Sequence, residues 1–232
     1  MHRLLPLLLA LLPMPLQALD LMPTTLRLPA AQGRSELWLH NPGPGHWRGQ
    51  VQIWAWDQQP GAEHLQRSAQ VLASPTLLDL PAGARQRVWL LPASSMPVAA
   101  EQAFRIILAP AEPTMPRYSL PLFRGEPADP APPCLQAEVV ANGSQLMLRL
   151  LNGGSAHARL SDLAYEAADG HRSLLLPGLA GYVLASRQRQ WQLPPRADGY
   201  AGGRFRARLQ DGAEVVLAAS TTAIAASQPS GL

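Results

Sequence analysis

The sequence predicts an all-β protein made of two antiparallel β-sandwiches. Its 232 residues include 24 prolines and 18 glycines, which divide the chain into short segments. Within these segments apolar and polar residues alternate with the period of two that is typical of half-buried strands. A proline-rich stretch at residues 125–133 separates two such β-rich halves. Turn signals recur roughly every eight to twelve residues, as expected for sandwiches.

The N-terminus has the three zones of a secretory signal. A charged start at residues 1–3 is followed by an apolar run from Leu4 to Leu12 and by a short segment, with Pro13 and Pro15, that ends in the small residue Ala18. We expect cleavage after Ala18, which leaves an exported chain of about 214 residues, enough for two domains. No later stretch approaches the roughly 20 apolar residues that a membrane-spanning helix needs.

The first half, residues 19–124, contains several clear strand patterns. In Ser35 to Asn41, Leu37 and Leu39 share one face, and Trp38 points the other way. Gln50 to Trp56 repeats this alternation. Two further apolar segments are expected to form strands: Arg85 to Leu91 and Phe104 to Leu108. This half is therefore expected to form a complete β domain.

The stretch 125–133 is expected to be a semi-rigid connector, because its prolines fix φ and offer no amide donors. The second domain is expected at 134–220. It carries three hairpin signals, Asn142-Gly143, Asp169-Gly170 and Asp211-Gly212, each between two apolar segments. Residues 221–232 are rich in Ala, Ser and Gln, and we assign them no role.

Charge and composition narrow the possible partners. The net charge is +3, and all 19 basic residues are arginines scattered without a basic tract, so nucleic-acid binding is not indicated. Any anion site must be built from guanidinium groups, which favour two-pronged recognition of a carboxylate. The single cysteine, Cys134, cannot form an intrachain disulfide.

No catalytic, metal or cofactor site is indicated. The six histidines show no pairing at ligand spacing, and those after the signal are interpreted as surface or loop residues. Gly154 to His157 lacks the Gly-x-Ser-x-Gly elbow of a nucleophile and is interpreted as a turn. Trp54 and Trp56 share one side of a strand, where sheet-face packing is favoured over a binding surface. An enzyme is therefore not expected.

Several segments, taken in order, resemble fimbrial (pilus) chaperones, most closely the branch that serves archaic, spore-coat-protein-U-like pili. The first-domain segments are PTTLRLP (23–29), LWLHN (37–41), VQIWAW (51–56), SPTLLDLPAG (74–83), FRIIL (104–108) and RYSLPLF (117–123). The second-domain segments are GLAGYVL (178–184) and RQWQLP (189–194). The resemblance covers essentially the whole mature chain.

The resemblance implies two immunoglobulin-like sandwiches in an L-shaped, boomerang-like arrangement. It also implies a periplasmic chaperone that binds pilin subunits by donor-strand complementation and delivers them to an outer-membrane usher. A pilin that lacks its last strand exposes an apolar groove and an unpaired sheet edge, which the chaperone covers with a strand of its own.

We expect the lent strand at Met115 to Phe123. The family's basic residue on the first strand corresponds to Thr25 here, with an arginine two residues along on the same face. The residues expected to bind the subunit are Arg27, Arg105, Met115, Arg117, Tyr118, Leu120 and Leu122. Among these, Arg117, with Arg27 or Arg105, is expected near the site for the subunit's terminal carboxylate.

Two other classes are alternatives. A secreted β-sandwich acting as a pilus subunit or adhesin would show a missing terminal strand and an N-terminal donor extension. Leu19 to Leu28 instead resembles an ordinary first strand. A periplasmic hydrolase on a β scaffold would need a convergent acid, base or nucleophile set, which the sequence does not display.

Overall fold

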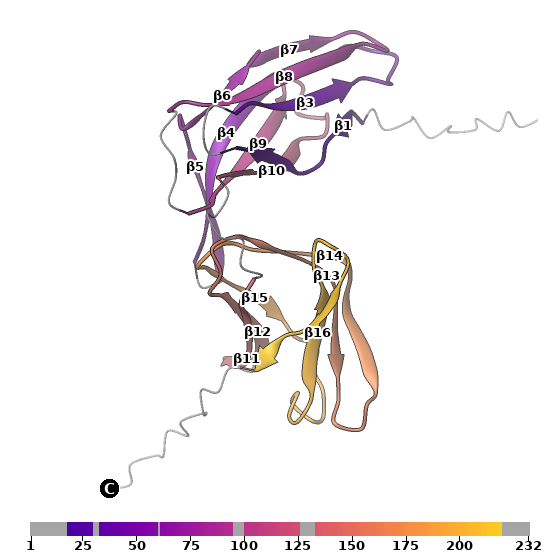
Figure 1. Cartoon of the computed structure of the whole chain (residues 1–232). Coiled ribbons are helices and arrows are strands. Elements are labelled where there is room, and N and C mark those ends of the chain that lie inside the picture. Colours follow the sequence, from indigo (N-terminus) through magenta and orange to yellow (C-terminus); the bar gives the residue numbers. More distant parts are fainter. Residues whose placement is uncertain (1–17, 30–32, 60, 95–99, 126–132, 220–232) are drawn as a thin grey trace, which may run out of the picture.

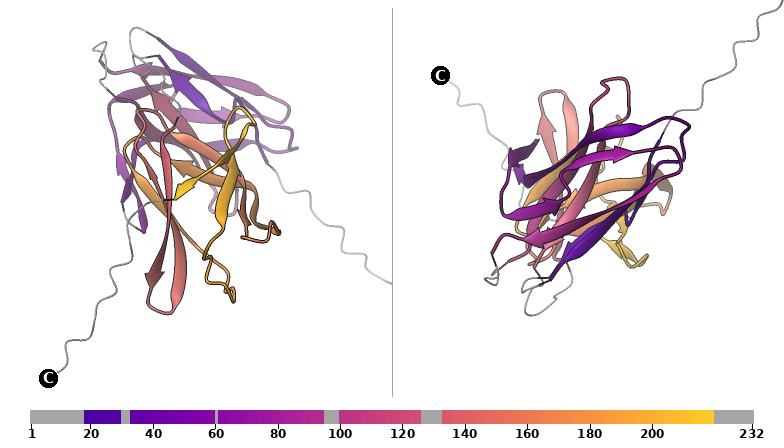
Figure 2. Two further views of the ribbon diagram at one scale, coloured as in Figure 1. Left: turned by 60° about the horizontal axis from the view of Figure 1, so that its bottom comes forward. Right: turned by 90° about the horizontal axis from the view of Figure 1, so that it is seen from above.

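The computed structural model describes residues 18–29, 33–59, 61–94, 100–125 and 133–219. The described part consists of strands, turns and loops, without helix. Figure 1 shows two separate β bodies, the second hanging below one end of the first, and the view from above shows the first lying over the second (Figure 2). The predicted pair of immunoglobulin-like sandwiches in an L-shaped arrangement is confirmed. The expected signal peptide, most of the connector and the tail lie outside the described residues.

The first domain packs two sheets against each other. One has the order β1-β3-β8-β6, and the other has the order β2-β10-β9-β4-β5, with β7 paired to β4. The strands are β1 (Asp20–Met22), β2 (Leu26–Leu28), β3 (Ser35–His40), β4 (Trp47–Gln59), β5 (Ala62–Arg67), β6 (Val71–Ser74), β7 (Leu77–Leu80), β8 (Arg85–Pro92), β9 (Gln102–Pro110) and β10 (Tyr118–Arg124).

The second domain has the same two-layer construction. Its sheets have the orders β15-β12-β11-β18 and β14-β13-β16-β17. The strands are β11 (Leu135–Asn142), β12 (Gln145–Asn152), β13 (Ala158–Glu166), β14 (Arg172–Val183), β15 (Gln188–Gln192), β16 (Arg204–Arg208), β17 (Glu214–Val216) and β18 (Ala218–Ala219).

The alternation predicted for the first-domain strands is confirmed. Leu37 and Leu39 are fully buried in the core, whereas Trp38 between them is 44% exposed. Val51 and Ile53 of β4 likewise point into the core. Burial of one face by alternate apolar residues therefore fixes the register of these strands.

The three predicted hairpins are also present. β11 and β12 pair with Asn142 opposite Gln145, so the two-residue loop is Gly143-Ser144, one position later than the Asn-Gly signal. Gly143 has φ +59°, which favours glycine at the first loop position of such a turn. The Asp-Gly signals fall between β13 and β14 and between β16 and β17.

A buried asparagine occupies the corresponding strand end in each domain. The amide of Asn41 donates to the carbonyls of Gly45 and Leu80, and its oxygen accepts from the N–H of Gly43. Asn152 does the same with Ala156, Val183 and Gly154. Both side chains satisfy loop backbone groups that would otherwise be buried without partners.

Candidate functional site

The outer face of the sheet β2-β10-β9-β4-β5 turns toward the second domain, and we call it the interdomain face. Trp56 and Phe123 lie on this face and pack against Tyr182 and Leu184 of the second domain, all four at most 5% exposed. Trp56 meets Tyr182 edge to face, with ring centroids 5.7 Å apart. The paired tryptophans of the sequence therefore include one that holds the two domains together.

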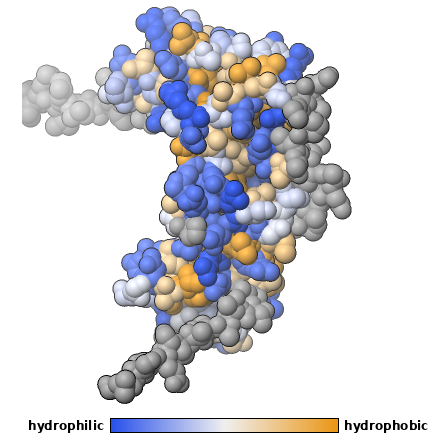
Figure 3. Space-filling view, turned by 90° about the vertical axis from the view of Figure 1, so that its left-hand side faces the viewer, coloured by the Kyte–Doolittle hydropathy of each residue, from blue (hydrophilic) through white to orange (hydrophobic). Residues whose placement is uncertain are grey.

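The β4–β5 hairpin extends from the first domain and bridges to the second. The amide of Gln58 donates to the Tyr182 carbonyl at 2.9 Å, and its oxygen accepts from the Leu184 N–H at 2.9 Å. Two ion pairs flank this contact, Asp57 with Arg187 and Glu63 with Arg189. Figure 3 looks onto this side and shows hydrophilic residues gathered between the two domains.

A second polar contact crosses the domain boundary at His157. Its backbone N–H and its ring Nδ1 both lie within 2.9 Å of the Glu101 carboxylate, and both side chains are at most 3% exposed. His157 does lie in a loop, directly before β13, but it is buried, so its interpretation as a surface residue is wrong. Sequence spacing carried no signal for it, because its carboxylate partner lies in the other domain.

Arg105 of β9 stands on the interdomain face. Its guanidinium carbon lies 3.7 Å above the Trp56 ring and 5.9 Å from that of Tyr182. The side chain is half-buried, yet among the described residues its guanidinium has no hydrogen-bond or ion-pair partner. Burial lowers the pKa of Arg105, and the nearby Glu63 carboxylate opposes that shift. Stacking thus holds a cation whose N–H donors remain available for an anion.

The other two predicted arginines are placed differently. Arg27 is exposed on the same face, beside Phe123 in the parallel pairing of β2 with β10. Arg117 is exposed and precedes the first residue of β10, at the end of that strand remote from Phe123. The structure therefore brings Arg27 and Arg105 to one face and leaves Arg117 apart from them. Thr25 lies at the boundary, where its hydroxyl is 3.3 Å from that of Tyr182.

The apolar residues predicted for the lent strand are mostly used inside the first domain. Leu120 and Leu122 belong to its core, with 8% and 0% exposure, and Met115 and Tyr118 pack against that core. Met115 lies in a turn, so the strand begins only at Tyr118. These side chains, which are expected to bind a subunit, therefore already serve the core of the first domain, and removing them from it would unpack that domain.

Part of β10 has a backbone edge that is available to pair with another strand. β2 covers only Leu122 to Arg124, and in the described chain no strand pairs on that side of Tyr118 to Pro121. The Gly125 N–H donates toward β2, to Leu28 at 3.1 Å, so by alternation the backbone groups of Pro121 and Ser119 face the same side. Pro121 is tolerated because the amide it lacks would point away from β9.

Within the described ranges, no three His, Cys, Asp or Glu side chains come together in a group that could hold a metal. No helix long and apolar enough to cross a membrane occurs in those ranges either. Cys134 is an exposed free thiol.

Comparison with known proteins agrees with this geometry. Residues 18–118 match the family model for the pili and flagellar-assembly chaperone, PapD N-terminal domain. No curated protein matches the sequence significantly. The matched residues cover nearly all of the first sandwich.

Solved structures extend the likeness to both domains. A chain of the CsuC–CsuE chaperone–tip adhesion subunit pre-assembly complex, from archaic chaperone–usher Csu pili of Acinetobacter baumannii, is 21% identical with a TM-score of 0.72, covering 88% of this chain and 99% of that one. The Pseudomonas aeruginosa CupB2 chaperone is 13% identical, with a TM-score of 0.58 and coverages of 85% and 97%. The Escherichia coli chaperone DraB is 15% identical, with a TM-score of 0.57 and coverages of 88% and 97%.

The sheets and the packed face between the domains define a protein of two β-sandwich domains in contact with each other. Residues 18–118, in the first domain, match the PapD N-terminal domain family, and the chain as a whole has the two-domain fold of the solved pilus chaperones. Its first sandwich already has β10 as its last strand, unlike the alternative of a pilus subunit with a missing terminal strand.

Proposed function

We propose that this chain is a periplasmic chaperone that holds a pilin subunit along the β10 edge and delivers it to an outer-membrane usher. The observation that carries the proposal is the uncovered edge at Tyr118 to Pro121, on a chain with the fold of pilus chaperones. A sheet edge offers unpaired N–H and C=O groups, so it accepts a strand from another polypeptide.

In this proposal Ser119 is central to strand pairing. It supplies both an N–H and a C=O to the free side, whereas Pro121 supplies only its C=O. The apolar side chains of β10 remain in the first-domain core, so recognition along the edge is chiefly through the backbone. Burial of β10 side chains in the subunit then contributes less to the binding free energy than backbone pairing and contacts with the interdomain face do.

Arg105 is the proposed anchor for the terminal carboxylate of the subunit. It is half-buried and stacked on Trp56, which limits the entropy lost when it binds an anion. Its donors have no partner among the described residues, so a carboxylate would not have to displace an ion pair from Arg105 itself. A charge-assisted hydrogen bond of this kind contributes about 1.5 to 3 kcal/mol.

The test is complex formation with a donor-strand-deficient pilin. The mature protein is expected to form a one-to-one complex, and Arg105→Ala is expected to weaken it about ten- to a hundredfold. Arg27→Ala removes an exposed arginine from the same face and serves as the matched control, with less than about threefold change expected.

Two outcomes would count against the proposal. If no complex forms with the wild-type chain, the chaperone function fails for that subunit. If a complex forms and Arg105→Ala leaves its affinity unchanged, Arg105 is not the anchor and the carboxylate site lies elsewhere.

A further inference from the structure

The donors of Arg105 are free, but a carboxylate already stands close by. Glu63 of β5 lies opposite Gln58 in the β4–β5 pairing and reaches the second domain, where it pairs with Arg189 at 2.9 Å. Burial is the main cause that lowers the pKa of Arg105; the Glu63 carboxylate opposes this shift, and the positive charge of Arg189 adds to it. Glu63 and Arg189 are 36% and 28% exposed, so solvent reaches this pair.

Tryptophan rings support the arginines of this region. The guanidinium carbon of Arg189 lies 5.2 Å from the centroid of Trp191, and that of Arg67 lies 5.2 Å from Trp54. Arg105 and Arg189 both approach Tyr182: its ring lies 5.9 Å from the Arg105 guanidinium carbon, and its carbonyl accepts from Arg189 at 3.5 Å. The Glu63 carboxylate pairs with one of these two arginines, Arg189. Such a cluster has an excess of positive charge and favours an additional anion.

We propose that Glu63 is an internal stand-in for the carboxylate of the bound subunit: it neutralises this arginine cluster in the empty chaperone and is displaced when the subunit carboxylate enters. The inference rests on the proposed function of Arg105. Because Glu63 belongs to an exposed hairpin, its side chain can turn to solvent while the Gln58 side chain keeps its hydrogen bonds to the second domain.

Displacement has a consequence for affinity. The subunit carboxylate competes with the tethered carboxylate of Glu63. The apparent affinity of the chaperone for the subunit is therefore lower than it would be without Glu63. A partly exposed ion pair of this kind is weak, and its removal is expected to raise affinity by about two- to fivefold. This competition lowers the affinity of the site for other anions and favours dissociation of the subunit.

The test compares Glu63→Gln with Asp57→Asn, using the donor-strand-deficient pilin as the probe. Asp57 is on the same hairpin and also pairs with a second-domain arginine, Arg187, so its loss removes an equivalent interdomain ion pair. Glu63→Gln is expected to bind the pilin about two- to fivefold more tightly, and Asp57→Asn is expected to bind no more tightly than wild type.

A double-mutant cycle with Arg105→Ala separates the two proposals. If Arg105→Ala weakens binding and the gain from Glu63→Gln shrinks in its presence, both proposals hold. If Arg105→Ala weakens binding but Glu63→Gln binds like Asp57→Asn, or more weakly than wild type, the stand-in role is overturned and the anchor stands. If Arg105→Ala has no effect, the anchor fails, and the stand-in role fails with it.

A spectroscopic readout checks the exchange directly. In protein with ¹⁵N-labelled arginine, the side-chain N–H signals of Arg189 are expected to move on Glu63→Gln and on addition of the pilin to wild type. Signals that move with the substitution but stay fixed on pilin binding would show that Glu63 keeps its partner, and the inference would be wrong.

Discussion

His157 and Phe123 lie face to face across the domain boundary, with ring centroids 3.5 Å apart and an interplanar angle of 8°. Glu101 holds the histidine in this position through the backbone N–H and the ring Nδ1. Phe123 in turn packs with Trp56 and Tyr182. One carboxylate of the first domain thus orients a ring of the second domain against the shared cluster.

Glu101→Gln is expected to loosen this boundary. The substitution replaces a carboxylate that accepts two hydrogen bonds in a nearly fully buried setting, and we expect the free energy of unfolding to fall by about 1.5 to 3 kcal/mol. Urea unfolding followed by tryptophan fluorescence measures it, since Trp56 lies in the boundary cluster. Glu112→Gln in an exposed turn is the control, and equal stability of the two variants would contradict this role.

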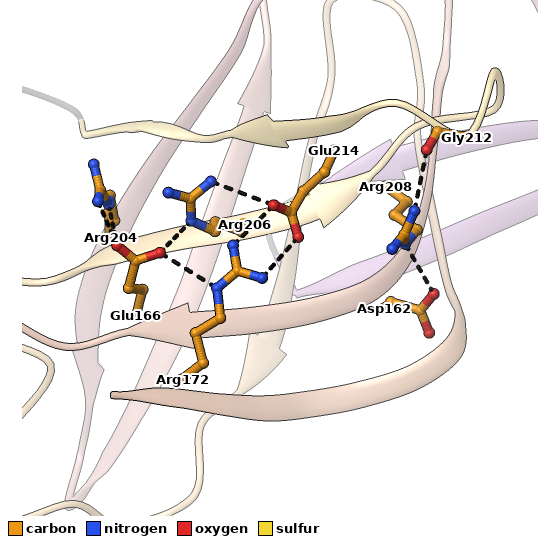
Figure 4. A network of polar contacts seen from close by, with 8 residues as sticks. All are labelled: Asp162, Glu166, Arg172, Arg204, Arg206, Arg208, Gly212 and Glu214. Atoms are coloured by element: carbon orange, nitrogen blue, oxygen red, sulfur yellow. Dashed lines mark hydrogen bonds and ion pairs between the residues drawn. The ribbon is translucent and has the colours of Figure 1, made fainter. Parts of the chain in front are cut away.

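Acid should weaken the second domain through Glu166. This carboxylate is bound by Arg204, Arg206 and Arg172 on the outer face of one sheet, with Glu214 completing the network (Figure 4). Hydrogen bonds from Arg204 and Arg206 are the main cause that lowers the pKa of Glu166 from 4.5 to about 2. The pKa is lower in the folded state, so this contribution is complete above about pH 4.5 and is lost as the pH falls toward 2.

Thermal unfolding between pH 5 and pH 2 tests that dependence. Glu166→Gln should be less stable than wild type at pH 5, and the difference between them should narrow as the pH falls. Asp198, whose pKa is also lowered to about 2 by Arg196, remains in both proteins and supplies a shared background. A difference that stays constant over this range would show that the Glu166 charge is not what stabilises the domain.

Gly203 is required by close packing in the second domain. A Cβ at this position would lie 2.2 Å from the hydroxyl oxygen of Tyr165 and 2.5 Å from the Glu166 carbonyl. Tyr165 is fully buried, so it has little room to move. Gly203→Ala is therefore expected to lower the free energy of unfolding by about 1 to 3 kcal/mol.

Gly153→Ala is the matched control for Gly203→Ala, because a Cβ there would have its nearest contacts at 3.9 Å. Urea denaturation of the two variants should show a lower midpoint for Gly203→Ala alone. If both variants have the wild-type midpoint, the region around Tyr165 is more adaptable than its packing indicates.

The strands and hairpins were predictable because their signals are local. The alternation around Leu37 and Leu39 depends only on residues that are adjacent in the chain, and so do the Asp-Gly turn signals. The family resemblance added the two-domain arrangement, and it indicated Arg105 as one of three candidate arginines. Local pattern and family likeness were thus sufficient for the fold class and for one residue of the proposed site.

The remaining parts of the site depend on contacts between distant segments. Glu63 and Arg189 are 126 positions apart, and Glu101 and His157 are in different domains. The direction of Leu120 and Leu122 depends on the register of β10 against β9, and a shift by one residue would reverse it. Trp54-Ala55-Trp56 was the sequence signal for the interdomain contact. Its two tryptophans lie on the face of the strand opposite the core, and large apolar side chains there are covered by a second surface.

The central claim is that a pilin completes its sheet on the β10 edge, and Ser119→Pro tests it most directly. The Ser119 N–H faces away from β9, so proline removes the edge donor and leaves the ladder of the first domain intact. Ser119→Ala keeps the N–H and is the control. Binding of a donor-strand-deficient pilin should weaken about tenfold for Ser119→Pro and remain unchanged for Ser119→Ala. Wild-type affinity in a folded Ser119→Pro protein would contradict strand pairing at this edge.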